Sequence, residues 1–202
     1  MNSPIYFYLS FGSPYSYIAA QKIEEIAIKY HRQVFWRPVR LRNIIGKLNN
    51  KIDQIVSPKK MNYMRKDSNR TASLLKLPFE RPEGDPPFDC DEAYACAYSF
   101  SEGDEVKLRN ISLALISAVW AQGHSINKKE NIQKALQGFH QSSNLIKACC
   151  ESQKGHKDHY HNINDALESG MFGSPWIIID NENFWGHDRL QYIDLWLSKK
   201  NS

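Results

Sequence analysis

The sequence has no C-x-x-C motif, no long apolar run and little excess of either charge. No run approaches the roughly 18–20 apolar residues that span a bilayer, so we predict no membrane segment. Lys and Arg total 26 against 22 Asp and Glu, an excess too small to indicate nucleic-acid binding, although it favours an anionic ligand. The first residues, MNSPIYFYLSF, lack a basic region and an A-x-A cleavage site, which predicts no signal peptide and a cytoplasmic location.

The length and composition of the chain indicate one globular domain, or one domain that carries an insertion. The 202 residues are 42% apolar and 24% charged, which is ordinary for such a chain. Four cysteines are expected to stay reduced in the cytoplasm. The adjacent Cys149 and Cys150 could indicate redox chemistry, but we expect two small, semi-buried thiols on a helix.

Two α/β segments flank a long helical region. We predict strands at residues 5–9 and 34–41, separated by a helix that begins at Ser13-Pro14 and ends near residue 31. A polar loop should cover residues 47–60. Helices are expected at 61–75, 91–101, 104–122, 128–138, 142–154 and 157–169, with a proline-rich connection at 78–89. A strand at 176–180, a turn at 181–183, a partner strand from Phe184 and a helix after Gly186 complete the chain.

This order predicts an α/β protein with a thioredoxin-like fold. The elements read β-α-β, then a large all-helical insertion, then β-β-α, and the first two strands should be parallel. We therefore expect a discontinuous thioredoxin-like domain at residues 1–60 and 170–202, and an inserted helical domain at residues 61–169.

Three blocks carry a family resemblance: SPYSY at 13–17, FGSPWIIID at 172–180 and NFWGHDRL at 183–190. WRPVRL at 36–41 and AVWAQGHSI at 118–126 lie between them. The set resembles the DsbA-like branch of the thioredoxin superfamily, and within it the 2-hydroxychromene-2-carboxylate isomerases and kappa-class glutathione transferases. The resemblance runs end to end and implies glutathione as cofactor and a homodimer.

The first block holds the candidate catalytic residue, Ser13. A redox relative would have C-P-x-C here, but serines occupy both cysteine positions, Ser13 and Ser16, so disulfide exchange at this site is excluded. A helix start still suits an anion, including a thiolate that a ligand brings. The resemblance places Ser13 beside the glutathione sulfur as a hydrogen-bond donor. The alternative is that Ser13 only caps the helix, and the two roles are compatible.

The second and third blocks hold candidate glutathione-binding residues. The resemblance implies a cis Ser174-Pro175 bond that turns the Ser174 backbone toward the cysteinyl group, although a trans proline at a strand start is the alternative. It also implies that His187 and Asp188 bind the γ-glutamyl end. The family often has Ser, Asn or Gln at 187, so the role of the His187 side chain stays open. Asp188 could instead be a plain helix-start acid, and Arg189 is expected to be structural.

A further pair of candidates lies in the polar loop. By resemblance, Asn50 and Lys60 contact the substrate or the glycyl carboxylate of glutathione, with Lys59 as an alternative to Lys60. The family has glycine where this chain has Met61, and solvated loop lysines are the other interpretation. We predict no metal site, because the histidine run at 156–161 lacks zinc-ligand spacing and should be a solvated helix start.

The resemblance implies a glutathione-dependent isomerase. Glutathione thiolate adds to a conjugated carbon of an aromatic 2-oxo acid, the adduct rotates, and elimination returns glutathione, which interconverts 2-hydroxychromene-2-carboxylate and its open benzylidenepyruvate. The alternatives are a kappa-like glutathione transferase that acts on other electrophiles, and a non-catalytic DsbA-like binding protein.

Overall fold

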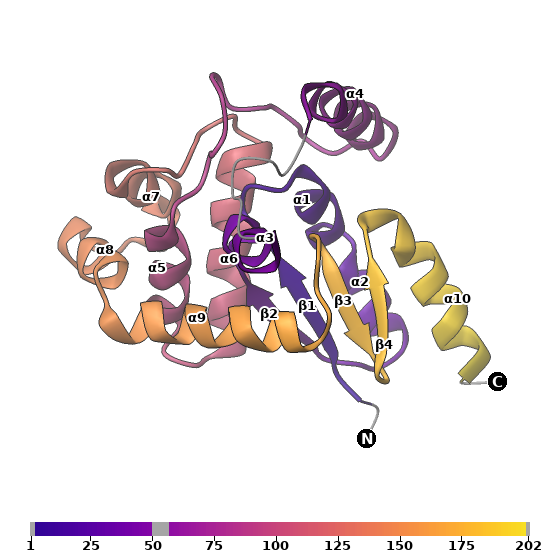
Figure 1. Cartoon of the computed structure of the whole chain (residues 1–202). Coiled ribbons are helices and arrows are strands. Elements are labelled where there is room, and N and C mark those ends of the chain that lie inside the picture. Colours follow the sequence, from indigo (N-terminus) through magenta and orange to yellow (C-terminus); the bar gives the residue numbers. More distant parts are fainter. Residues whose placement is uncertain (1–2, 50–56, 201–202) are drawn as a thin grey trace.

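A four-stranded sheet with helices on both faces forms the centre of the molecule (Figure 1). The structure, a computed structural model, describes residues 3–49 and 57–200. The strand order is β2-β1-β3-β4, in which β1 (Ile5–Leu9) is parallel to β2 (Val34–Pro38) and antiparallel to β3 (Trp176–Ile179). β4 (Glu182–Trp185) pairs antiparallel with β3. The predicted thioredoxin-like fold is confirmed.

The helices follow the predicted distribution. α1 (Pro14–Ala20) and α2 (Ile23–Lys29) lie between β1 and β2, and α10 (Leu190–Lys200) closes the chain after the short 3-10 turn η3 (His187–Arg189). Between β2 and β3 the described helices are α3 (Leu41–Asn49), α4 (Pro58–Leu74), α5 (Asp91–Ser101), α6 (Glu105–Trp120), α7 (Lys129–Ala135), the 3-10 turn η2 (Gln137–Phe139), α8 (Ser143–Cys150) and α9 (Gln153–Glu168). No described helix is both long and apolar enough to span a membrane.

The two faces of the sheet bury different side chains because neighbouring residues of a strand point in opposite directions. Phe7 and Trp36 pack into the main core with side chains of α1, α2, α6 and α10. Tyr8 and Trp176 point to the other face, where α3 and α9 cover them. The main core also includes buried residues of α5, α7 and α8, so apolar packing continues from the sheet into the helical region.

Close packing of α9 on α5 depends on one glycine. A Cβ atom at Gly155 would lie 2.2 Å from the Ala95 carbonyl oxygen, so a larger residue here would push the helices apart. Cys149 and Cys150 are buried on α8, which confirms their expected place on a helix.

Several predicted boundaries are wrong for local reasons. The helix expected from 14 to 31 is broken at Gln21 and Lys22, whose N–H groups bond to Ile18 and Ala19 carbonyls three residues back. The second strand stops at Pro38, and residues 41–49 form α3, which the sequence did not indicate. The hairpin turns at Asp180 and Asn181, with φ of 53° and 65°, because a two-residue turn needs left-handed residues.

Candidate functional site

Three buried serines meet where β1 leads into α1. Ser13 caps α1, and its Oγ accepts a hydrogen bond from the Ser16 N–H at 3.2 Å. The Ser13 hydroxyl also donates to the Ser174 carbonyl at 3.2 Å, and the Ser16 and Ser174 hydroxyls lie 2.6 Å apart. The Ser174-Pro175 bond is cis, as expected. Ser13 therefore caps the helix and also lies against the segment that the sequence assigned to ligand binding.

The loop before Ser13 is held by two residues of the helical region. Gly12 N–H donates to Asp89 Oδ2 at 3.1 Å, and Phe11 N–H donates to the Tyr94 hydroxyl oxygen at 2.9 Å. The Tyr94 hydroxyl donates in turn to Asp89 Oδ2 at 2.5 Å. A Cβ atom at Gly12 would lie 3.0 Å from the same oxygen, so the close approach favours glycine. These contacts fix the backbone that presents Ser13.

The Asp89 carboxylate is buried and is paired with a positively charged side chain. Arg40 reaches it from the segment after β2, with Nη2 2.9 Å from the Asp89 carbonyl oxygen and Nε 3.5 Å from Oδ1. Arg40 Nη1 also bonds to Asp91 at 3.2 Å. Burial lowers the pKa of Arg40, but the charges of Asp89 and Asp91 outweigh burial and raise it. Sequence reasoning missed these three residues as parts of the site, because only the fold brings them together.

The structure places His187 beside the start of α1. Its ring stacks on Tyr15 with centroids 4.9 Å apart and planes 2° from parallel. The Tyr15 hydroxyl donates to Asp67 Oδ2 of α4 at 2.8 Å. Burial lowers the pKa of His187, which favours the neutral ring. These contacts join η3, α1 and α4 beside the serine cluster. Sequence reasoning did not identify Tyr15 and Asp67 as parts of this site.

Asp188 presents a half-exposed carboxylate next to His187. Burial alone would raise the pKa of Asp188, but the hydrogen bond and charge of Arg189 outweigh it, so the pKa is lowered. Arg189 thus pairs with a nearby carboxylate, as a structural arginine would. Gly186 precedes them with φ of 109°, and a Cβ atom there would lie 2.5 Å from Asp188 Oδ1. The turn therefore needs glycine to present this carboxylate.

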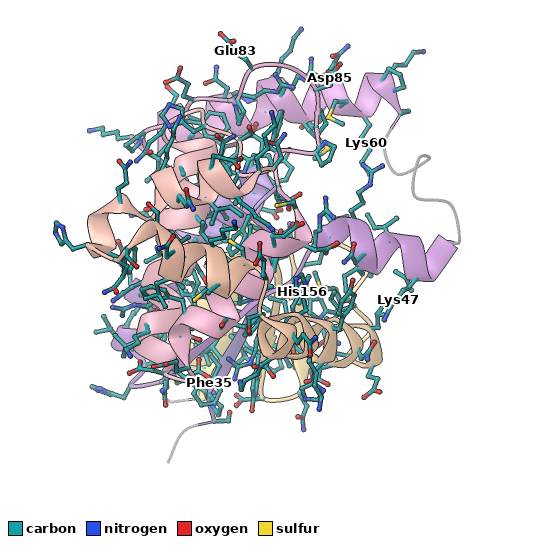
Figure 2. The ribbon with its side chains drawn as sticks, turned by 90° about the vertical axis from the view of Figure 1, so that its left-hand side faces the viewer. Phe35, Lys47, Lys60, Glu83, Asp85 and His156 are labelled. Carbon is teal, nitrogen blue, oxygen red and sulfur yellow. The ribbon has the colours of Figure 1, made fainter. Side chains whose placement is uncertain are left out.

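Lys59 and Lys60 lie in the first turn of α4 and not in a loop. Ser57 caps this helix by accepting from Lys60 N–H at 3.3 Å, so the predicted loop is wrong from Pro58 onward. Figure 2 shows Lys60 on the side of α4 that faces α3. Both lysines are exposed. Asn50 lies outside the described residues.

The histidine run is not a solvated helix start, because His159 is fully buried within α9. Its Nε2 accepts from Arg40 N–H at 3.3 Å, and its ring stacks on Tyr94 with centroids 4.7 Å apart. Burial lowers the pKa of His159 to about 3. His159 therefore supports the residues behind the serine cluster. Within residues 3–49 and 57–200, no group of His, Cys, Asp and Glu could hold a metal ion.

The depressed pKa of His159 predicts how stability depends on pH. An unfolded histidine titrates near about pH 6.5, so the neutral buried ring contributes its full stability above that pH. As pH falls from 6.5 toward 3, the free energy of unfolding should fall by about 1.4 kcal/mol per pH unit from this group. The free energy of unfolding, measured with urea between these pH values, should fall more steeply with decreasing pH in the wild type than in His159→Phe. The phenylalanine ring keeps the stack on Tyr94.

The exposed His124 provides the control. His124→Gln should retain the wild-type slope, because that side chain is in water in both states. An unchanged slope in His159→Phe would contradict the assignment of this titration to His159.

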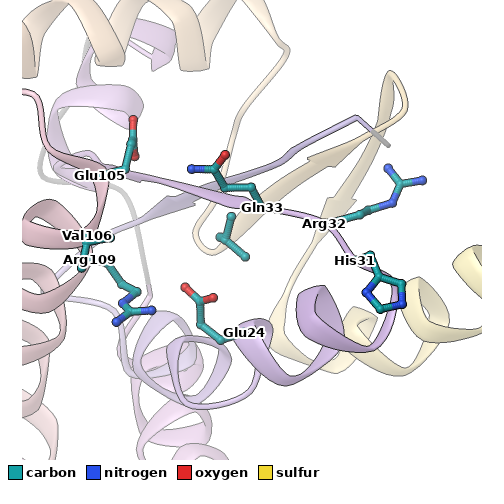
Figure 3. A pocket seen from close by; sticks show the side chains of 8 residues that line it. Glu24, His31, Arg32, Gln33, Glu105, Val106 and Arg109 are labelled. Carbon is teal, nitrogen blue, oxygen red and sulfur yellow. The ribbon is translucent and has the colours of Figure 1, made fainter. Parts of the chain in front are cut away.

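A hollow of about 410 Å³ lies away from the serine cluster, beside the start of β2 (Figure 3). Glu24 of α2 and Arg109 of α6 line it, together with His31 and Gln33. None of the residues that the sequence assigned to glutathione lines this hollow, so it is a separate feature of the surface.

Comparison with known proteins places this chain in a family. Residues 4–197 match the DsbA-like thioredoxin domain. The chain belongs to the DsbA-like thioredoxin family. The resemblance expected from the sequence is confirmed.

Among relatives of this DsbA-like chain, a 2-hydroxychromene-2-carboxylate isomerase of Sphingobium xenophagum is 26% identical over 204 residues, covering 98% of this chain and 99% of the relative. A glutathione S-transferase kappa 2 of Caenorhabditis elegans is 22% identical over 203 residues, covering 93% and 88%. A solved structure of a 2-hydroxychromene-2-carboxylate isomerase has a TM-score of 0.83 at 21% identity, covering 96% of this chain and 94% of that one. The relatives suggest an enzyme.

Proposed function

We propose that the protein is a glutathione-dependent isomerase that acts on 2-hydroxychromene-2-carboxylate or a similar aromatic 2-oxo acid. The observation that carries the proposal is the buried Ser13 hydroxyl, 3.2 Å from the Ser174 carbonyl, at the position where a redox relative has cysteine. The site therefore has a hydrogen-bond donor but no thiol of its own. The names of the relatives, isomerases and a kappa glutathione transferase, support the same chemistry.

Ser13 acts on a thiol that the ligand supplies. A free thiol has a pKa near about 8.5, so little of it is thiolate at neutral pH. The Ser13 hydroxyl can turn from the Ser174 carbonyl and donate to the sulfur, which stabilises the thiolate. Because α1 has only seven residues, we assign this stabilisation to the hydroxyl and not to the helix dipole.

The remaining candidates fit the ends of glutathione. The Ser174 backbone would pair with the cysteinyl group, and the half-exposed Asp188 carboxylate would bind the α-ammonium group in place of Arg189. Because burial lowers the pKa of His187, its ring is neutral and does not repel the ammonium group. Lys60, and Asn50 by resemblance, would hold a carboxylate of the substrate or of the glycyl end.

The reaction conserves glutathione. After the ring of the substrate opens, the thiolate adds to the conjugated carbon and forms a C–S bond. The electron pair of the double bond passes to the 2-oxo oxygen as an enolate, and the former double bond becomes a single bond. Rotation about that bond and elimination of the thiolate then re-form the double bond in the other geometry. One glutathione thus serves many turnovers, and Ser13 stabilises the thiolate before addition and again after elimination.

Counting glutathione tests the proposal. With 2-hydroxychromene-2-carboxylate in excess over glutathione, we expect the absorbance of the open product to appear while the free thiol titre stays constant. A thiol titre that falls in step with product would indicate a kappa-like transferase instead, which the Caenorhabditis elegans relative favours. No turnover with bound glutathione would leave a binding protein.

A further inference from the structure

A second groove lies on the face of the sheet that α9 covers. It has a volume of about 330 Å³, and β1 forms its floor, α9 one wall, and the turn between α5 and α6 the other. Figure 1 shows α9 running across this face of the sheet. None of the residues assigned to glutathione lines the groove.

The floor of the groove is aromatic. Tyr6 and Tyr8 are two residues apart on β1, so both point to this face. Tyr98 adds a third ring, and its own hydroxyl is used, since it donates to the Pro38 carbonyl at 2.9 Å. Tyr8 is only 6% exposed, yet its hydroxyl makes no hydrogen bond with any described part of the chain. This unpartnered oxygen is free to accept a hydrogen bond from a donor that enters the groove.

The wall on α9 carries two carboxylates, Asp158 and Asp165. They are seven positions apart on the helix, which places their Cα atoms about 10.5 Å apart along the axis. Their partners, Lys154 at 2.5 Å and His161 at 3.5 Å, have side chains 72% and 74% exposed. Such exposed pairs are worth about 0–1 kcal/mol, so a better cation can replace them.

The other wall contributes no net charge. Arg37 is paired there with Glu105 at 2.9 Å, so the two groups neutralise each other. Among the residues that line the groove, negative charges therefore exceed positive ones by two, of which Lys154 neutralises one until a ligand replaces it, in a chain whose formal net charge is +4. This excess is local, and the bulk charge of the protein opposes non-specific binding of cations.

We propose that this groove binds a linear aliphatic diamine or polyamine that lies along α9. One ammonium group would bind Asp158 and the other would bind Asp165 and the free Tyr8 oxygen, while the methylene chain crosses the tyrosine rings. The spacing of the two carboxylates excludes one ammonium group from bridging both, and aromatic faces favour a cation. This inference does not depend on glutathione chemistry.

Calorimetry with putrescine, spermidine and n-butylamine on the full chain tests the proposal at physiological salt. We expect saturable binding of both polyamines with a Kd of about 1 mM or below, and binding of n-butylamine at least about tenfold weaker, because it has one ammonium group. Asp158→Asn and Asp165→Asn should each weaken putrescine binding by at least about fivefold. Tyr8→Phe, which keeps the packing, should weaken it by about threefold.

Asp85→Asn is the matched control, because it removes the same charge at a side chain that is 93% exposed and outside the groove. It should leave the Kd unchanged. Equal affinity for n-butylamine, an equal loss in Asp85→Asn, or no heat with about 10 mM putrescine would each overturn the proposal.

Discussion

Replacing Ser13 by alanine should lower kcat/KM for the isomerisation at pH 7 by about 25-fold. A bound thiol whose pKa returns from about 6.5 to about 8.5 falls from about 76% to about 3% thiolate at that pH. The Ser13 hydroxyl is a hydrogen-bond donor placed to stabilise a ligand thiolate. A shift of about two units in the pKa of that thiol corresponds to about 2.7 kcal/mol. Because the thiolate is the nucleophile, losing its stabilisation lowers the fraction of bound glutathione that reacts at neutral pH. Steady-state kinetics at saturating glutathione would measure the loss.

Loss of a helix cap must be separated from loss of the donor. Ser142→Ala is a matched control, since Ser142 caps α8 by accepting from Leu145 N–H at 3.2 Å but lies outside the serine cluster. Each variant should lose about 1 kcal/mol of stability from the cap. Only Ser13→Ala should lose activity, and raising the pH should restore part of it because more thiol ionises. Equal activity in the two variants would remove Ser13 from the chemistry.

Replacing Asp89 by alanine should destabilise the protein by about 3–5 kcal/mol, because it removes one of the two carboxylates that pair with Arg40 and the acceptor of two buried donors. The change would leave the Gly12 N–H and the Tyr94 hydroxyl without their shared acceptor, and Arg40 would keep only its ion pair with Asp91. Activity should fall as well, because Gly12 directly precedes Ser13 and loss of its hydrogen bond would shift the Ser13 hydroxyl.

Urea unfolding monitored by circular dichroism would measure the effect. Asp85→Ala is the control, since its carboxylate is exposed and pairs with Arg65 at 3.6 Å on the surface, and it should change stability by less than about 1 kcal/mol. If Asp89→Ala also changed stability by less than about 1 kcal/mol, the hydrogen bonds of Asp89 and Tyr94 to the loop before Ser13 would contribute little to stability. Asp89→Asn should fall between the two, because the amide oxygen can still accept from Gly12.

The local signals of the sequence predicted the sheet and most of the helices. The short apolar strands and the Ser13-Pro14 helix start each specify structure within a few neighbouring residues, whereas the cis Ser174-Pro175 bond was expected from the family resemblance. Helix α5 was predicted at its observed bounds, Asp91–Ser101. α3 was missed, because its polar end at Lys47 reads like the loop that was expected there.

The support of the site could not be predicted in the same way. Asp89 and Tyr94 are 77 and 83 residues from their backbone partners Gly12 and Phe11, so no local pattern links them. His159 looked solvated because its neighbours in the sequence are polar, but on α9 it points away from them toward Tyr94. The binding roles of Ser174, Asp188 and Lys60 stay predictions.

The most direct test of the account is the pKa of the thiol of bound glutathione. Thiolate absorbance near about 240 nm should be followed against pH in wild type, Ser13→Ala and Ser142→Ala at saturating glutathione. We predict a pKa about two units below the free value of about 8.5 in wild type and Ser142→Ala, and a return toward 8.5 in Ser13→Ala. A bound thiol that titrates at its free value in the wild type would contradict the account.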